Sequence, residues 1–374
     1  MSRSRSTHAG TLVARRAMVL ASLSAALVGP ACSPRDRVAA EVGPPDIVRP
    51  TGTTEVRLGY FASLAHAPAI LGLRDGLFAR ELGATRLIPH EFTAGPEVVQ
   101  ALFADAVDIA YVGANPAVTA YVRSRSGGGA LRIVAGSTSG GAALVVRSGI
   151  ERPADLRGAV LATPQLGNTQ DVALRVWLRS QRLHTDSDRA DSVRIVPQSN
   201  ADTFAAFRSG RIDGAWVAEP WVARLVEEGG AKVLVDEASL WRGGRFTSAV
   251  VVARTEFLRR HPDAVAAVLR AHLGALRLIG TERGGTAGTP SHVAERVGEG
   301  LAAATGERLG RSVLARAWTR LHFGADPLAP TIAQAASDAS SVGLLPDHDV
   351  RGIEDLRILR LLEAHRPSAE RAPR

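Results

Sequence analysis

Residues 160–171 read VLATPQLGNTQD: an apolar run, a loop of amide and hydroxyl side chains, and the first turn of a predicted helix. The run Val160–Ala162 has the length and composition of a buried strand, and helical spacing continues over Thr169–Gln181. The same order of short apolar run and amphipathic segment recurs along the chain from Glu55 onward. This alternation is typical of α/β proteins. The sequence therefore predicts an α/β fold with mostly parallel sheets.

Ten apolar runs are predicted as strands, and the amphipathic segments between them as helices. From Thr281 onward, after a break at 280–290, the pattern predicts helices only. The predicted strands are Val56–Phe61, Arg86–Glu91, Asp108–Val112, Arg132–Ala135, Ala143–Val146, Val160–Ala162, Val193–Val196, Gly214–Val217, Val233–Val235 and Ser248–Ala253. The predicted helices are Leu71–Arg80, Glu97–Ala104, Pro116–Arg123, Thr169–Gln181, Ala201–Arg208, Pro220–Glu228 and Glu256–Ile279.

Two glycine-bearing stretches, Ser137–Gly141 and Trp241–Arg245, each lie between two predicted strands. We interpret them as a pair of crossings between two lobes, where glycine supplies the backbone freedom of a hinge. Ordinary surface loops are the alternative. The crossings predict an outer lobe of residues 54–140 plus 244–345, an inner lobe of 141–243, and a C-terminal helix and tail at 346–374.

The first 32 residues have the features of an export leader. Arginines up to Arg16 precede the apolar run Ala17–Val28, which is too short to span a bilayer. The sequence Gly29-Pro30-Ala31-Cys32 resembles a bacterial lipobox, so Cys32 is the predicted lipid anchor; plain cleavage near Ala31 is the alternative. Residues 33–54 read as a flexible tether. The protein is therefore expected in the periplasm or on the outer face of the cell membrane, exported by the general or the twin-arginine route.

The net charge of +8 is not concentrated in a stripe. Four arginines lie before Cys32, and those after it alternate with acidic residues, so a nucleic-acid partner is not expected. Cys32 is the only cysteine, which rules out a disulfide within the chain. No metal-ligand cluster, nucleophile elbow or phosphate-binding glycine loop is visible, so neither an enzyme nor a cofactor or metal site is expected.

Polar side chains follow four of the predicted strands, at the edge where α/β proteins bind ligands. These loops offer hydroxyl, amide and backbone donors at helix starts, and none of the four contains Lys or Arg. Helix N-termini attract anions without a formal cation, which suits a fully ionised oxyanion such as a sulfonate or nitrate. Capping of the helices is the alternative role of these side chains. The candidate ligand-binding residues are His66, Asn115, Ser137, Ser139, Gly140, Gln165, Asn168 and Thr169.

Two further candidates lie in the stretch Asp213–Trp221. Trp216 ends a predicted strand and could form a wall for the apolar tail of a ligand, or pack in the core. Glu219 could cap or lock the following loop, or face an amino group of the ligand. Trp221 is predicted to pack in the core.

The runs Leu64–Ala69, Tyr111–Ala117, Ala135–Val146, Ala162–Leu174 and Asp213–Trp221 together resemble a known family. It is the nitrate/sulfonate/taurine family of ABC-transporter substrate-binding proteins, and the aliphatic-sulfonate branch in particular. The resemblance implies a type II periplasmic-binding-protein fold, with two lobes joined by a two-strand hinge and a ligand in the cleft. It also implies partnership with an ABC permease and ATPase. Members often have Thr where this chain has Ala65, Gly-Pro-Asn where it has Gly113-Ala114-Asn115, and Pro where it has Ala218.

The sequence therefore predicts a monomeric, extracytoplasmic solute-binding lipoprotein of an ABC importer that captures an aliphatic sulfonate. Nitrate, taurine, bicarbonate and a pyrimidine precursor of thiamine are alternative ligands. An extracytoplasmic sensor with the same cleft is an alternative function. Enzymes of related fold, such as thiamine-precursor synthesis proteins and menaquinone-pathway lyases, are the least favoured class.

Overall fold

The computed structural model describes residues 52–185, 189–281 and 289–365, all of which belong to one compact unit of the chain. The predictions for the leader, for Cys32 and for the tether up to Thr51 fall outside the described residues. The same holds for the tail beyond His365 and for most of the predicted break at 280–290.

Six strands form the sheet of the first lobe, in the order β11-β4-β10-β3-β1-β2. β1 pairs in parallel with β2 and β3, whereas β10 runs antiparallel to β3 and β4, and β11 antiparallel to β4. The strands are β1 (Glu55–Phe61), β2 (Arg86–Phe92), β3 (Ile109–Val112), β4 (Leu131–Gly140), β10 (Thr247–Arg254) and β11 (Leu321–Phe323).

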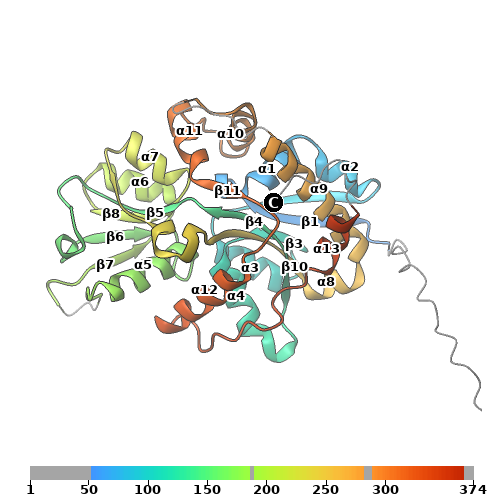
Figure 1. The fold of residues 1–374 in the computed structure, drawn as a ribbon, viewed down its shortest axis with the longest axis horizontal. Coiled ribbons are helices and arrows are strands. Elements are labelled where there is room, and N and C mark those ends of the chain that lie inside the picture. Colours follow the sequence, from blue (N-terminus) through green and yellow to red (C-terminus); the bar gives the residue numbers. More distant parts are fainter. Residues whose placement is uncertain (1–51, 186–188, 282–288, 366–374) are drawn as a thin grey trace, which may run out of the picture. The chain divides into compact units, whose positions relative to one another are not determined.

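Five strands form the sheet of the second lobe, in the order β7-β6-β8-β5-β9 (Figure 1). β6 is parallel to β7 and β8, and β5 is antiparallel to β8 and β9. The strands are β5 (Ala142–Val146), β6 (Val160–Thr163), β7 (Arg194–Pro197), β8 (Gly214–Ala218) and β9 (Lys232–Asp236).

The predicted two-lobe α/β architecture is confirmed, but each sheet is mixed rather than mostly parallel. The cause is the pair of crossings, because β5 and β10 each begin directly after the chain has changed lobes. Each of them therefore enters its sheet from the edge at which the parallel strands end, and runs antiparallel to its neighbours.

The crossings themselves have left-handed glycine backbones. At the first, β4 and β5 are separated by Gly141 alone, and the φ angles of Gly140 and Gly141 are 79° and 75°. The stretch Ser137–Gly141, predicted as a loop, is thus strand as far as Gly140. The second crossing consists of two 3-10 helices, Glu237–Leu240 and Arg242–Gly244, with φ angles of 75° at Gly243 and 70° at Gly244. Only glycine adopts these angles without strain.

Helices cover both sheets (Figure 1). α11 packs against α7, and α12 against α4 and α5, so the C-terminal region contacts both lobes. The α-helices are α1 (Ala67–Arg74), α2 (Leu77–Leu82), α3 (Gly95–Phe103), α4 (Ala114–Ser124), α5 (Thr169–Ser180), α6 (Asn200–Arg208), α7 (Trp221–Glu227), α8 (Thr255–Arg260), α9 (Pro262–Thr281), α10 (His292–Thr305), α11 (Arg311–Thr319), α12 (Ala329–Ser341) and α13 (Arg357–Ala364). Further 3-10 helices lie at Leu64–His66, Arg125–Gly127 and Pro153–Leu156.

Three predicted elements differ from the observed ones. The predicted helix Leu71–Arg80 divides into α1 and α2 at Asp75 and Gly76, where Gly76 has a left-handed φ of 66°. The predicted helix Glu256–Ile279 divides into α8 and α9 because Pro262 has no N–H to continue the ladder. The region after Thr281 is not all helical, since β11 pairs with the end of β4.

α9 forms part of the core of the first lobe. Among the described helices it alone is long and apolar enough to cross a membrane, but 56% of that stretch is buried within the fold. Its His272 donates from Nε2 to the carbonyl of Gly136 (2.9 Å) and accepts at Nδ1 from the hydroxyl of Tyr111 (2.8 Å). Burial lowers the pKa of His272 to about 4 and raises that of Tyr111, so both groups are neutral. The bonded pair ties β3, β4 and α9 together.

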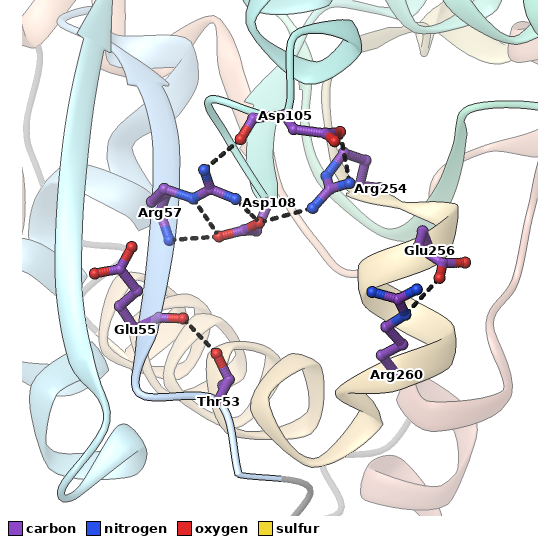
Figure 2. A network of polar contacts seen from close by, with 8 residues as sticks. All are labelled: Thr53, Glu55, Arg57, Asp105, Asp108, Arg254, Glu256 and Arg260. Carbon is purple, nitrogen blue, oxygen red and sulfur yellow. Dashed lines mark hydrogen bonds and ion pairs between the residues drawn. The ribbon is translucent and has the colours of Figure 1, made fainter.

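A network of charged side chains lies at the edge of this sheet where β1 and β3 begin (Figure 2). Asp108, of which 2% is exposed, accepts from Arg57 Nε at 2.9 Å and from Arg254 Nη2 at 3.2 Å. Arg254 also pairs with Asp105 at 2.6 Å. Burial alone would raise the pKa of Asp108, but the hydrogen bonds from Arg57 outweigh it and hold that pKa below its usual range. The network therefore lies away from the carboxyl ends of the parallel strands.

Candidate ligand-binding site

A cavity of about 570 Å³ lies between the carboxyl ends of two sets of parallel strands. From the first lobe its lining comes from residues at the ends of β1, β2 and β3, and from the second lobe from residues at the ends of β6, β7 and β8. Each set is parallel within its own sheet. Open α/β sheets bind ligands at this edge, and the two lobes present it to each other across one cavity.

Four helix N-termini point at this cavity. The N-cap residues of α3, α4, α5 and α6, which are Ala94, Gly113, Asn168 and Ser199, all line it. The start of a helix offers backbone N–H groups and a partial positive charge. Asn168, Ser199 and Thr169 accept from some of these N–H groups, and the others remain for a ligand. The cavity is therefore suited to an anion.

The described residues that line the cavity include no Lys or Arg, and they include two carboxylates, Glu91 and Glu97. Glu97 accepts from the backbone N–H of Thr93 at 3.1 Å and from its hydroxyl at 2.8 Å. Glu91 is exposed at the end of β2. The cavity thus combines an anion-attracting set of N–H groups with negative charge at one side.

His66 lines the cavity as a neutral donor. Its Nδ1 accepts from the backbone N–H of Phe61 at 3.1 Å, and its ring stacks on Phe61 with centroids 4.3 Å apart. Burial lowers the pKa of His66 to about 3. The ring is therefore uncharged, and the tautomer follows from the Phe61 bond: Nε2 carries the hydrogen.

The loop between β6 and α5 is held in place by a buried carboxylate. Asp171 accepts from the hydroxyl of Thr163 (3.0 Å), the N–H of Gly167 (3.0 Å) and Arg175 Nε (2.9 Å). Asn168 caps α5 by accepting from the N–H of Thr169 at 2.6 Å. Gln165 lines the cavity from this fixed loop, and its buried Oε1 has no hydrogen-bond partner among the described residues.

Two further amide residues, which the sequence analysis did not predict, line the cavity. Gln198, directly after β7, and Asn200, the first residue of α6, line the same cavity, and the buried Nε2 of Gln198 and Oδ1 of Asn200 have no partner among the described residues. Their signal was present in the sequence, because they follow the predicted strand Val193–Val196 as the other candidates follow theirs. Buried polar atoms are costly when unpaired, so three such side chains around one cavity indicate a ligand that satisfies them.

Six candidate residues do not line this cavity, and four of them are the polar or glycine residues Asn115, Ser137, Ser139 and Gly140. Asn115 donates from Nδ2 to the carbonyl of Ala335 at 2.9 Å and lines a neighbouring cavity instead. Ser137, Ser139 and Gly140 are part of β4, which pairs with β10 at one edge and β11 at the other. They therefore lie inside the sheet and not in a loop that follows it. The Ser139 hydroxyl donates to the carbonyl of His322 at 3.5 Å, and the Gly140 carbonyl accepts from the hydroxyl of Ser248.

Trp216 packs in the core, which was the alternative to its candidate role, whereas Trp221 packs only in part against the core and also lines the cavity. Trp216 is fully buried in β8, where Nε1 donates to Glu237 Oε2 at 2.7 Å and the ring packs on Trp177. The strand is paired with β6 and β5 at its edges, and α5 and α7 pack against it, so the Trp216 side chain is enclosed. Trp221, expected in the core, lines the cavity together with Phe61 and Phe92. It is the aromatic wall that the sequence analysis assigned to Trp216.

Glu219 is buried beside the cavity and is engaged by the protein. Its Oε2 accepts from the N–H of Ala223 at 3.0 Å, and its Oε1 lies 3.1 Å from Arg320 Nε. Burial raises the pKa of Glu219 to about 7, although the bond from Ala223 and the charge of Arg320 act against this. These contacts are those of a group that locks its loop.

The comparisons place the chain in a family. Residues 49–294 match the sequence profile of the NMT1-like family, which is more than half of the chain, and the protein belongs to this family. A relative from Escherichia coli K12, named taurine-binding periplasmic protein, is 31% identical over 211 residues. The match covers 56% of this chain and 62% of the relative, so the chain spans less than two thirds of that protein.

Two solved structures show the same fold. The alkanesulfonate-binding protein SsuA from Xanthomonas axonopodis pv. citri, bound to MOPS, has a TM-score of 0.62 at 21% identity over 79% of this chain and 96% of its own. The nitrate-binding protein NrtA from Synechocystis PCC 6803 has a TM-score of 0.66 at 15% identity over 83% and 89%. The predicted family resemblance and two-lobe binding-protein fold are confirmed. The relatives named here are binding proteins and not enzymes. This agrees with the prediction from the sequence that the protein is not an enzyme.

Proposed function

We propose that this protein is the extracytoplasmic solute-binding component of an ABC importer, and that it captures an aliphatic sulfonate in the cavity between its lobes. The observation that carries the proposal is the convergence of three unpartnered amide side chains and four helix N-termini on one cavity whose described lining has no cation. A permease and an ATPase are the proposed partners.

The chemistry of a sulfonate fits this lining. A sulfonate stays ionised and needs only its oxygens satisfied, which N–H groups at helix starts, His66 Nε2 and Gln198 Nε2 provide. Phe61, Phe92 and Trp221 supply apolar surface for the carbon chain. Nitrate has no carbon chain, so this part of the wall favours a sulfonate over nitrate.

A specific observation favours a second candidate, an aminoalkanesulfonate such as taurine. Glu91 and Glu97 line the cavity, and a ligand ammonium group would pair with one of them. The unpartnered Gln165 Oε1 and Asn200 Oδ1 are hydrogen-bond acceptors, and they also favour a ligand with N–H groups. A ligand carrying both charges would satisfy both sides of the cavity.

A thermal-shift screen of the purified protein tests the proposal. We expect methanesulfonate, longer alkanesulfonates and taurine to raise the melting temperature in a concentration-dependent manner, because a ligand that binds only the folded state stabilises it. Nitrate, sulfate and a thiamine-precursor pyrimidine are the competing ligands. Stabilisation by the neutral pyrimidine with no response to any sulfonate would contradict the proposal.

Ligand binding is proposed to close the lobes. A ligand that contacts both lobes stabilises the closed arrangement, and the glycines at 140–141 and 243–244 would take up the rotation. Small-angle scattering should then give a smaller radius of gyration with saturating ligand. An unchanged radius under conditions of demonstrated binding would argue against closure.

The membrane anchor is proposed to be Cys32, which lies outside the described residues. When the full chain is expressed in a bacterium, the protein should fractionate with membranes, and Cys32→Ser should release it or leave it unprocessed. Equal solubility of the two forms would remove the anchor while leaving export untouched.

A further inference from the structure

A second cavity, of about 850 Å³, lies on the other side of Thr169 from the ligand-binding cavity. Thr169 is the one described residue that lines both. The walls come from α4 in the first lobe, α5 in the second, α12, and the crossing segment 237–245. Nothing in the proposed function uses this space.

Much of the wall is apolar and aromatic. Trp177, Val172 and Val176 line the cavity from α5, and Trp241 lines it from the crossing segment. The Trp241 ring is itself positioned by stacking on the buried Phe246, with centroids 5.7 Å apart and planes 18° apart. An organic molecule with an apolar body would find contact on both sides.

The interior holds a carboxylate that is only half satisfied. Glu237 lines the cavity with 1% of its surface exposed; Oε2 accepts from Trp216, and the Trp241 indole is close enough to lower the pKa of the carboxyl, but Oε1 itself has no hydrogen-bond partner among the described residues. Asp338 lines the cavity from α12 and accepts from Gln334 Nε2 at 2.8 Å. A buried carboxylate oxygen without a donor calls for a hydrogen-bond donor from a ligand.

The outer part of the cavity is cationic. Arg242 and Arg245 line it from the crossing segment, and both are exposed. Neither forms an ion pair or side-chain hydrogen bond with another described residue, whereas most of the other arginines that the structure describes do. Two unpaired guanidinium groups beside a hydrophobic wall are suited to an anionic group.

We propose that this cavity is a second ligand site for a small apolar zwitterion, of which an apolar amino acid is the simplest case. Its ammonium group donates to Glu237 Oε1, its acidic group lies by Arg242 and Arg245, and its apolar part packs on Trp177 and Trp241. Glu237 and the two arginines all belong to the crossing segment 237–245. A bound ligand would therefore contact the connection between the lobes.

The test is calorimetry on the purified protein with L-leucine and L-tryptophan, and with tryptamine and indole-3-propionate, which each lack one charged group. At least one amino acid should bind saturably, and loss of either charged group should weaken binding at least tenfold. Glu237→Gln keeps an acceptor for Trp216 but replaces Oε1 by a donor, and should weaken binding at least fivefold. The surface variant Arg242→Ala/Arg245→Ala should do the same without affecting the fold.

The control is Gln165→Ala in the first cavity, which should leave amino-acid binding unchanged. The proposal is overturned if neither amino acid binds at millimolar concentration, or if the arginine variant binds as well as the parent. It is also overturned if Gln165→Ala alone abolishes binding, which would place the amino acid in the first cavity. Titration of alkanesulfonate into the same variants separates the two sites, because failure of sulfonate binding with intact amino-acid binding contradicts only the proposed function.

Discussion

The hydroxyl oxygen of Thr169, at the start of α5 in the second lobe, accepts from the backbone N–H of Asn115, in α4 of the first lobe, at 3.4 Å. Gly113, the N-cap of α4, lies so close that a Cβ added to it would be 2.7 Å from the same Thr169 oxygen. The two lobes therefore approach each other at the N-termini of two helices, between the two cavities. A side chain at residue 113 would hold them apart.

This contact predicts the effect of Thr169→Val. The variant keeps the shape of the side chain but loses the hydroxyl, so it should weaken ligand binding in the first cavity by about 0.5–1.5 kcal/mol. Isothermal calorimetry with the best sulfonate measures the change. Thr281→Val, at the exposed end of α9, is the matched control, since its hydroxyl bonds only to Leu278. Equal affinity of the two variants would mean that the contact does not support binding.

The positions of Trp221 and Trp216 predict two different phenotypes. Trp221→Ala should weaken binding of long alkanesulfonates more than that of methanesulfonate, because it removes apolar contact at about 25 cal/mol per Å². Trp216→Ala should instead lower the free energy of unfolding by about 3–5 kcal/mol, since it empties a buried site. Binding titrations and chemical denaturation separate the two. A Trp221→Ala protein with the parent's chain-length preference would refute the assignment of the wall.

The network in Figure 2 predicts a large difference between two carboxylates. Asp108→Ala should destabilise the protein by about 3 kcal/mol, because it leaves Arg57 and Arg254 without their buried partner. Glu256→Ala removes exposed pairs with Arg259 and Arg260 and should cost less than about 1 kcal/mol. Urea denaturation at neutral pH compares them. Similar losses in both variants would show that burial does not distinguish these pairs.

Glu237 predicts a pH dependence of stability. Burial raises its pKa to about 7 from 4.5, and the charges of Asp236 and Asp338 add to this, while the indoles of Trp216 and Trp241 act in the opposite direction. Folding therefore favours the protonated carboxyl: this contribution is fully present below about pH 4.5 and is lost as the pH rises through 7.

Relative to Glu237→Gln, which cannot ionise, the parent protein should lose about 3 kcal/mol of stability between pH 4.5 and pH 8. Denaturation of both proteins across this range measures the difference. Parallel stability curves would show that the carboxyl does not titrate between the two states as described.

The ten strands predicted from apolar runs are all present, because short apolar runs favour strands even where, as in β2, β7 and β9, they are only partly buried. β11 was missed because Leu-His-Phe is too short to form a run, and it exists only because the end of β4 offers it a pairing edge. The positions of Ser137, Ser139 and Trp216 depend on which strands lie beside β4 and β8. Strand order is set by contacts between segments far apart in the chain, so the local sequence does not predict it. Gln198 and Asn200 were within reach of the same rule that found Gln165.

The proposed site requires that the unpartnered amide side chains contact the ligand between the lobes, and calorimetry of Gln165→Ala and Asn200→Ala measures their contribution. With an alkanesulfonate or taurine as ligand, each variant should bind about threefold to tenfold more weakly than the parent protein. Gln100→Ala, which removes an exposed amide on α3, should bind as the parent does. If Gln165→Ala and Asn200→Ala both bound every sulfonate as tightly as the parent protein, the ligand would not lie where this account places it.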